Sequence, residues 1–261
     1  MSALAAGEIA TGVYVATAEQ YTTTTTIVAG DDGACLVIDP AVSVADLAAL
    51  AGWLTARGLR PAAGWSTHPH WDHLLWARAL GDAPRYATPR AVAVTARDEA
   101  RLISDVSESA PGHDLSLFAR VQPLVGHELD WPGPRALIYA HDAHAPGHGA
   151  VFLPDSGVLV VGDMCSDVEI PLPDLDAADP FGDYREGLRL LADVPGVTTV
   201  VPGHGHVGDD SELRRRVAVD LAYLDAVQAG DDVADPRLTE DWLRAEHARQ
   251  LARAAGHVGP S

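Results

Sequence analysis

The most constraining feature of the sequence is the string Thr67-His68-Pro69-His70-Trp71-Asp72-His73. It places three imidazoles and one carboxylate side by side, directly after the strand-like segment 62–67. Histidines packed this densely repel one another whenever they are protonated. Imidazole nitrogen and carboxylate oxygen are ordinary ligands of zinc and its neighbours, so metal binding removes the conflict. The string therefore predicts a metal site.

A single ion does not easily accept all four groups, because a short loop turns successive side chains in different directions. Two divalent ions are the natural arrangement. His68 and His70 are predicted to face the first ion, and Asp72 and His73 the second. Zinc is the first expectation, although iron and manganese accept the same ligands.

The pattern His-x-His-x-Asp-His resembles the signature of the metallo-β-lactamase superfamily, and three further elements of that family follow in the family's order. Pro146-Gly147-His148 matches its Pro-Gly-His element, the apolar run 158–163 matches the strand that ends in Gly-Asp, and 202–205 matches its Pro-Gly-His-Gly element. The resemblance implies that His148 completes the first site, that Asp163 bridges both ions and that His204 completes the second. The ligand set that it implies is His68, His70, Asp72, His73, His148, Asp163 and His204.

Several other polar residues are expected to support this site. Asp39, directly after a predicted strand, resembles the family's buried structural aspartate. Cys165 is expected to be a small buried thiol. Four histidines are expected to lie on the surface or behind the ligands, where His144 or His206 could orient one of them; they are His127, His141, His144 and His206.

Strand-like and helix-like segments alternate along the chain. This pattern predicts one α/β domain over residues 1–261 with four layers, two sheets between outer helices, and C-terminal helices from about residue 211. The resemblance implies that this is the αββα sandwich of the metallo-β-lactamase fold. A hairpin is expected at 31–33, because Asp-Asp-Gly separates two β-branched runs. The predicted strands are 12–16, 22–29, 34–38, 62–67, 85–88, 136–140, 150–153, 158–161 and 197–201. The predicted helices begin at 44 and 89 or lie near 74–80, 184–191, 211–228 and 239–255, with loops at 104–114 and 170–181.

The formal net charge of −19 limits the classes of partner that the chain is expected to bind. Phosphate backbones and anionic membranes need clustered cations, so nucleic-acid and membrane binding are not expected. All 18 basic residues are arginine, which excludes Schiff-base chemistry through lysine. No signal peptide or long apolar segment is evident, and the two cysteines are too few for a disulfide framework. A cytoplasmic location is therefore predicted.

The resemblance implies a binuclear hydrolase that attacks a small ester, thioester or lactone with a metal-bound hydroxide. Asp72 is the expected catalytic residue, because it both binds the second ion and steers the proton of the water. The alternatives are an iron-dependent persulfide dioxygenase, a β-lactamase and a non-catalytic metal-binding module. Asp163 stands where zinc β-lactamases generally carry a different residue, which makes antibiotic hydrolysis a minor alternative.

The partner is expected to be a small-molecule substrate, and nothing in the sequence indicates an oligomeric state. Position along the chain suggests pocket-lining residues. Trp71 lies within the metal motif, Tyr21 precedes the Thr-rich strand, and Ser166 and Glu169 begin the long Pro/Asp-rich loop. Ordinary packing explains each of them as well, since only metal ligands are fixed by a motif.

Overall fold

The computed structural model describes residues 6–231 and 233–257, whose strands form two sheets. The seven-stranded sheet is antiparallel from β1 to β4 and parallel from β4 to β7. In spatial order it comprises β1 (Ala6–Ala10), β2 (Val13–Thr17), β3 (Thr24–Ala29), β4 (Ala34–Ile38), β5 (Arg60–Trp65), β6 (Arg85–Ala87) and β7 (Gln122–Pro123). The five-stranded sheet has only one parallel pair, β10 with β11. Its order is β12 (Gly208–Asp209), β11 (Thr199–Pro202), β10 (Val158–Gly162), β9 (His148–Leu153) and β8 (Leu137–His141).

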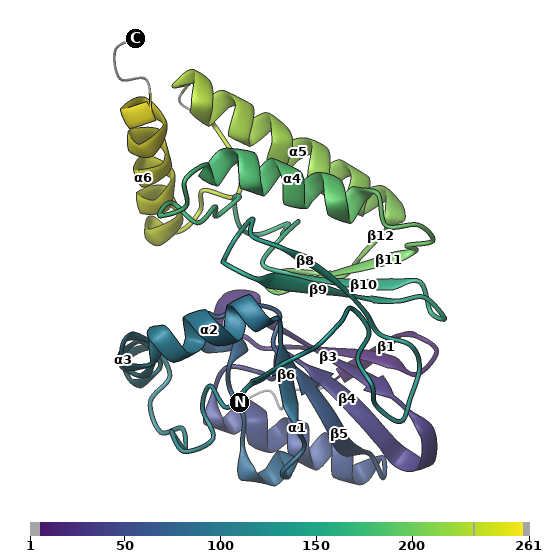
Figure 1. Cartoon of the computed structure of the whole chain (residues 1–261). Helices are drawn as coiled ribbons and strands as arrows, with labels where there is room; N and C mark the ends of the chain where they lie inside the picture. The colour runs from purple at the N-terminus through teal and green to yellow at the C-terminus, as the bar shows by residue number, and fades with distance from the viewer. Residues whose placement is uncertain (1–5, 232, 258–261) are drawn as a thin grey trace.

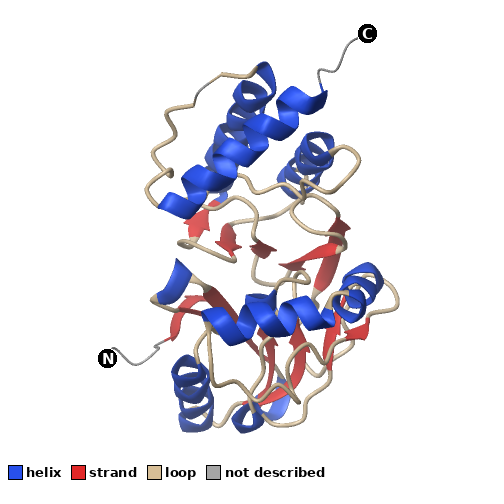
Figure 2. Cartoon of the chain, turned by 90° about the vertical axis from the view of Figure 1, so that its left-hand side faces the viewer, coloured by secondary structure: helices blue, strands red, loops and turns tan. Residues whose placement is uncertain are grey.

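Helices cover the outer faces of both sheets, so the chain has the four-layer αββα architecture predicted from its sequence (Figures 1 and 2). The five-stranded sheet is covered by α4 (Pro180–Ala192) and α5 (Asp210–Ala229), and α6 (Asp241–His257) packs against α5. The seven-stranded sheet is flanked by α1 (Val44–Ala56), α2 (Pro89–Arg97) and α3 (Glu99–Ser109). None of the helices in the described ranges has the length and apolar character needed to cross a bilayer.

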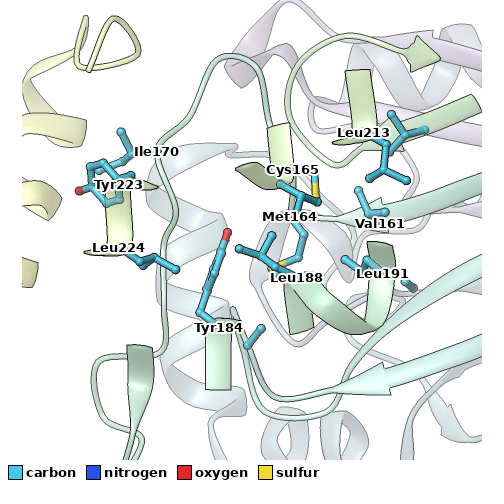
Figure 3. Packing of buried hydrophobic residues seen from close by; sticks show 14 of the residues in the cluster. Val161, Met164, Cys165, Ile170, Tyr184, Leu188, Leu191, Leu213, Tyr223 and Leu224 are labelled. Carbon is cyan, nitrogen blue, oxygen red and sulfur yellow. The ribbon is translucent and has the colours of Figure 1, made fainter. Parts of the chain in front are cut away.

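Three apolar clusters hold the layers together. The cluster between the sheets includes Leu36, Trp65 and Val160. A second cluster packs α1 and α3 onto the seven-stranded sheet through Leu50 and Val106. The third joins the five-stranded sheet to its helices, and Figure 3 shows its members from β10, α4 and α5. Each layer is thus fixed by apolar burial on the side that faces its neighbour.

Side-chain caps explain where several helices begin. The Ser43 hydroxyl accepts a hydrogen bond from the backbone N–H of Asp46, and the Asp46 carboxylate accepts one from the N–H of Ser43, which is a capping box. At α2 the cap is a single hydrogen bond, from the backbone N–H of Ala91 to the Thr88 hydroxyl, with Pro89 at the first helical position. The predicted start of both helices is therefore confirmed.

Two sequence-based predictions of local structure are wrong. Residues 74–80 form no α-helix: residues 74–77 are irregular and lie between the 3-10 turns η3 (Trp71–His73) and η4 (Arg78–Leu80). Leu74, Leu75 and Trp76 are all buried, and three successive residues cannot lie on one helical face. The predicted loop at 104–114 is helical up to Ser109, because α3 buries Leu102 and Val106 one turn apart.

Candidate metal centre

Four loops that follow or precede strands meet at one edge of the sandwich and carry the candidate ligands. The segment 67–73 follows β5, His144 lies in the turn between β8 and β9, Asp163 follows β10, and His204 follows β11. The two sheets are tied together at this edge, because the backbone N–H of Thr24 donates to the carbonyl of Gly203 over 2.7 Å. Carboxyl ends of parallel strands meet at one edge of a sheet, and this explains why residues far apart in sequence converge here.

The first group of donor atoms consists of three imidazole nitrogens and one carboxylate oxygen. His68 Nε2 lies 3.1 Å from His70 Nδ1, which in turn lies 3.0 Å from His144 Nε2. Asp163 Oδ2 lies 3.4 Å from His68 Nε2 and 3.5 Å from His144 Nε2. These four residues form one cluster that could hold an ion.

The second group is built from Asp72, His73 and His204. Asp72 Oδ2 lies 3.2 Å from His204 Nε2 and 3.5 Å from His73 Nε2, and the two nitrogens are 3.4 Å apart. Asp163 also reaches this group, with Oδ1 at 3.2 Å from His73 Nε2 and Oδ2 at 3.3 Å from His204 Nε2. Asp163 therefore stands between the two groups, as expected of a bridging ligand.

The spacing of the donor atoms suits ion binding. A tetrahedral zinc ion with ligands about 2.0–2.1 Å away keeps neighbouring ligand atoms about 3.3 Å apart. The contacts within both groups lie between 3.0 and 3.5 Å. Asp163 Oδ1 is buried and has no hydrogen-bond partner among the described residues, which is costly unless a cation contacts it. Each of the two groups could therefore hold a metal ion.

Hydrogen bonds behind the rings place the ring protons. His144 Nδ1 lies 2.8 Å from the carbonyl oxygen of Leu172, and His204 Nδ1 lies 3.0 Å from that of Tyr21. Because a carbonyl can only accept, each Nδ1 carries a proton, and Nε2 is the ring atom that faces the group. A metal ligand requires this arrangement, in which Nε2 gives up any proton when the ion binds.

Asp39 orients the histidines of the 67–73 loop from behind. Its carboxylate accepts hydrogen bonds from the backbone N–H and the hydroxyl of Thr67, over 2.9 and 2.6 Å. Since that hydroxyl donates to Asp39, it must accept from His68 Nδ1, 3.0 Å away. His73 Nδ1 lies 3.0 Å from Asp39 Oδ2. Through Thr67, Asp39 thus orients His68 with Nε2 towards the site, and it forms an ion-pair contact with His73, as predicted for a buried structural aspartate.

Electrostatics divides the centre into a neutral and a charged half. Burial lowers the pKa of His68 and His70, and lowers that of His144 to about 4, so the first group offers uncharged imidazoles. In the second group burial opposes protonation, but Asp163 and other carboxylates raise the pKa of His73 and His204 well above the ordinary value. The carboxylates therefore draw positive charge into this half, whether protons or a metal ion carry it.

The structure differs from the expected ligand set at His148. This residue begins β9, and its Nε2 lies 2.9 Å from the carbonyl oxygen of Val161, so Nε2 carries the ring proton. The lone pair is then on Nδ1, which takes part in neither group of donors. His144, expected only to support a ligand, occupies the third imidazole position instead. The Pro-Gly turn between the two histidines places His144 in the loop and His148 inside the ladder, a distinction that spacing alone does not reveal.

A model of the metallo-beta-lactamase superfamily matches residues 19–204, which include both groups of donors. The chain belongs to the metallo-beta-lactamase superfamily. The match ends at His204, so β12, α5 and α6 lie beyond it. No curated protein matches the chain.

Solved structures of this superfamily share the fold. A beta-lactamase domain protein from Burkholderia ambifaria is 20% identical, with a TM-score of 0.71 over 97% of this chain and 87% of its own. A metallo-beta-lactamase family protein from Thermus thermophilus is 21% identical, with a TM-score of 0.68 over 97% of this chain and 96% of its own. The DIM-1 metallo-beta-lactamase is 19% identical, with a TM-score of 0.63 over 85% of this chain and 98% of its own. At these identities the likeness shows the fold alone.

The proposed pocket residues lie around the second group. The Tyr21 ring is 44% exposed and meets Trp71 and His204 edge-on, with ring centroids 6.3 and 6.4 Å apart. The Ser166 hydroxyl donates to the carbonyl of His204 and accepts from backbone N–H groups of its own loop. Ser166 is thus engaged in holding the loop. Burial raises the pKa of Glu169 to about 7, and its Oε1 lies 4.0 Å from His204 Nδ1.

The remaining supporting residues are placed as follows. His141 is stacked on His148 and lies behind the first group. His206 is exposed and pairs with Asp167, while His127 is an exposed loop residue. Cys165 is fully buried, and burial raises the pKa of its thiol well above the ordinary value.

Proposed function

We propose that this chain is a binuclear metal-dependent hydrolase of a small ester, thioester or lactone. One observation carries the proposal. The Nε2 atoms of His68, His144 and His204 lie 3.3 to 3.5 Å from Asp163 Oδ2, and the Nδ1 atom of each ring is hydrogen-bonded to a protein acceptor. An arrangement of this kind prepares ligands for a cation in advance.

His68, His70 and His144 would hold the first ion, and Asp72, His73 and His204 the second, with Asp163 between them. When bound, divalent ions here would lower the pKa of a coordinated water and polarise a substrate carbonyl. Zinc is the ion that we expect. The side chain of Asp72 is 11% exposed, against 7% for that of Asp163, so Asp72 is the more accessible of the two carboxylates. Asp72 is therefore placed to accept the proton that the attacking water releases.

The net charge of the chain and the residues beside the second group support the proposed substrate class. A net charge of −19 opposes polyanionic substrates, which favours small neutral acyl compounds over nucleic acids. The exposed ring of Tyr21 beside Trp71 offers an apolar edge next to the second group, suited to the non-reacting part of such a substrate. The cytoplasmic location and the absence of a membrane partner stay predictions.

Metal content and turnover together test this function. Mass spectrometry on freshly purified protein should find about two zinc ions per chain, and a panel of esters, thioesters and lactones should be hydrolysed. A chelator should abolish turnover, and added zinc should restore it. Asp72→Ala should lose turnover, whereas Asp105→Ala, which removes an exposed carboxylate of α3, should keep it.

Three outcomes would overturn the proposal. Asp72→Ala with both ions bound and full activity would remove the role of Asp72. A single iron with oxygen uptake on a persulfide would identify a dioxygenase instead. Turnover of β-lactams but of none of the acyl panel would identify a β-lactamase.

A further inference from the structure

His148 is buried directly behind the first group of donors and forms the middle of a stack of three imidazole rings. Its ring centroid lies 4.9 Å from that of His68, and the two planes differ by only 12°. On the opposite side its centroid lies 4.6 Å from that of His141, with planes 22° apart. His148 and His141 are cross-strand partners in β9 and β8, so the sheet itself holds these two rings together.

The orientation of the His148 ring is fixed from two further sides. Its Nε2 donates to the carbonyl oxygen of Val161 over 2.9 Å. Gly162 lies against the ring, because a Cβ atom at this glycine would be 2.3 Å from His148 Nε2. The backbone of Gly162 also has a φ of +56°, which a residue with a side chain rarely adopts. The ring of His148 can therefore neither tilt nor turn without moving β10, the strand that leads to Asp163.

Hydrogen bonds to the backbone also fix the tautomers of the two stacked rings. His141 Nδ1 accepts a hydrogen bond from the backbone N–H of Ala143, which places its proton on Nε2. Both rings are thus locked as single tautomers by backbone groups.

His68 depends on this stack for its orientation. Its Nδ1 proton bonds the Thr67 hydroxyl, which restrains the ring at one atom but leaves rotation about that contact open. The His68 ring contacts two further rings, that of His73, with centroids 4.1 Å apart and planes 40° apart, and that of His148, which is nearly parallel to it. The parallel face of His148 limits the tilt of His68 and so keeps His68 Nε2 directed at His70 and Asp163. A tilt of the His68 ring would move its lone pair away from the first ion.

We propose that His148 is a positioning residue, which orients the ligand His68 through ring stacking and does not itself bind the ion. This inference rests on the proposed metal centre. It assigns the second histidine of the His144-Ala-Pro-Gly-His148 segment to the support of the first site and leaves ion binding there to His144.

Three variants of the full-length protein separate positioning from ligation. His144→Ala should lose one ion per chain. His148→Ala removes the stacked ring and should keep both ions, with the affinity of the first site for zinc weakened about 10–100-fold in a chelator competition. His148→Gln keeps a planar group and an N–H donor for Val161, so it should recover much of that affinity.

Cobalt-loaded protein gives a readout independent of turnover, because its visible absorption reports the geometry around the ion. The spectrum should shift in His148→Ala and return towards that of the wild type in His148→Gln.

Each failure has a distinct signature. If both His148 variants lose one ion as His144→Ala does, His148 is a ligand. If His148→Ala retains wild-type affinity and an unchanged cobalt spectrum, the stack has no positioning role. Wild-type protein without bound metal after zinc loading would instead refute the metal centre, and this inference with it. Circular dichroism on every variant identifies any that fails to fold, and His148→Gln, which keeps the hydrogen bond inside the sheet, then carries the test.

Discussion

Asp163 is the residue on which both halves of the centre depend, and its position is fixed by close backbone packing. It follows the last residue of β10, and its Oδ1 faces the backbone of Gly203, at which a Cβ atom would lie only 2.1 Å from that oxygen. Glycine is needed at position 203 for space and not for backbone conformation, since its φ is not left-handed. The Pro-Gly-His-Gly element thus supplies the ligand His204 and the room that Asp163 requires.

Replacing Gly203 by alanine should therefore damage the metal centre more than the fold. We expect Gly203→Ala to displace Asp163 and to weaken zinc binding at both sites about tenfold or more. Gly52→Ala is the matched control, because a Cβ at this position of α1 meets nothing within 4 Å. The control should keep full metal content and gain about 0.5–1 kcal/mol of stability. Chelator competition and urea unfolding measure the two effects, and unchanged affinity in Gly203→Ala would show that Asp163 is not held by this contact.

The two cysteines should not react with thiol reagents in the native protein. Cys35 and Cys165 are fully buried, and burial raises the pKa of Cys35 to about 12. Since the thiolate is the reactive form, neither side chain should react with a thiol reagent at pH 8. Addition of urea should expose two thiols per chain to the reagent. Rapid labelling of one thiol before unfolding would place that cysteine on an accessible surface.

At the residue scale, most of the candidate ligands could be predicted from the sequence. The protonated nitrogen of each histidine ring, which decides whether that ring can face an ion, could not. The positions of His68, His70, Asp72 and His73 follow from one short string, because residues in one tight loop cannot separate. His144 could not be distinguished from His148 in this way. The choice depends on where the carbonyls of Leu172 and Val161 lie, and these are set by segments far away in the sequence.

At the scale of elements, the C-terminal helices secure the loop that follows Asp163. Arg237, between α5 and α6, donates to the carbonyl of Ser166 and to the carboxylates of Asp220 and Asp235. Gln250 of α6 donates to the carbonyl of Pro171, next to the carbonyl that orients His144. Elements beyond the superfamily match therefore hold the backbone on which two ligands depend.

Loss of Arg237 should destabilise the whole protein. Asp220 is 1% exposed and lies 2.6 Å from Arg237 Nη1, so Arg237→Met leaves a buried carboxylate unpaired. We expect a loss of about 3–5 kcal/mol in the free energy of unfolding. Arg249→Met is the control, because that side chain is 65% exposed and its ion pair with Glu246 contributes about 0.5 kcal/mol or less. Equal urea midpoints for the two variants would refute a structural role for the buried network.

Most elements could be predicted because each buries one face with the appropriate period. Strand β4 and helix α1 are examples, and both begin where the sequence indicates. The exceptions depend on tertiary packing. The run Leu74-Leu75-Trp76 resembles a helix in composition, yet all three side chains enter the core from an irregular segment that the metal loop and α3 hold in place.

For the molecule as a whole, the net charge of −19 is a source of self-repulsion that the fold must overcome. Salt shortens the range of this repulsion, from a Debye length of about 30 Å at 0.01 M to about 8 Å at 0.15 M. The melting temperature should therefore rise by several degrees between 0.01 and 0.3 M NaCl, and equally in KCl. A melting temperature that falls with salt would mean that surface ion pairs outweigh the net repulsion.

Metal removal should also lower the melting temperature, because it increases the negative charge that the folded chain carries. Two divalent ions would change the formal charge from −19 to −15, and they would contact Asp72 and Asp163 where burial makes unpaired carboxylates costly. A ligand that binds only the folded chain stabilises it by about 4 kcal/mol at a thousand times its dissociation constant, and each kcal/mol moves the melting temperature of a chain this size by about 2–4 °C. Chelation should thus lower the melting temperature clearly, and stoichiometric zinc should restore it.

The Asp163→Asn variant should melt at nearly the same temperature with or without the chelator, because it lacks the charge shared by both sites. If chelation left the wild-type melting temperature unchanged, the donor groups would be stable without a cation, and the charge balance argued for the centre would be wrong.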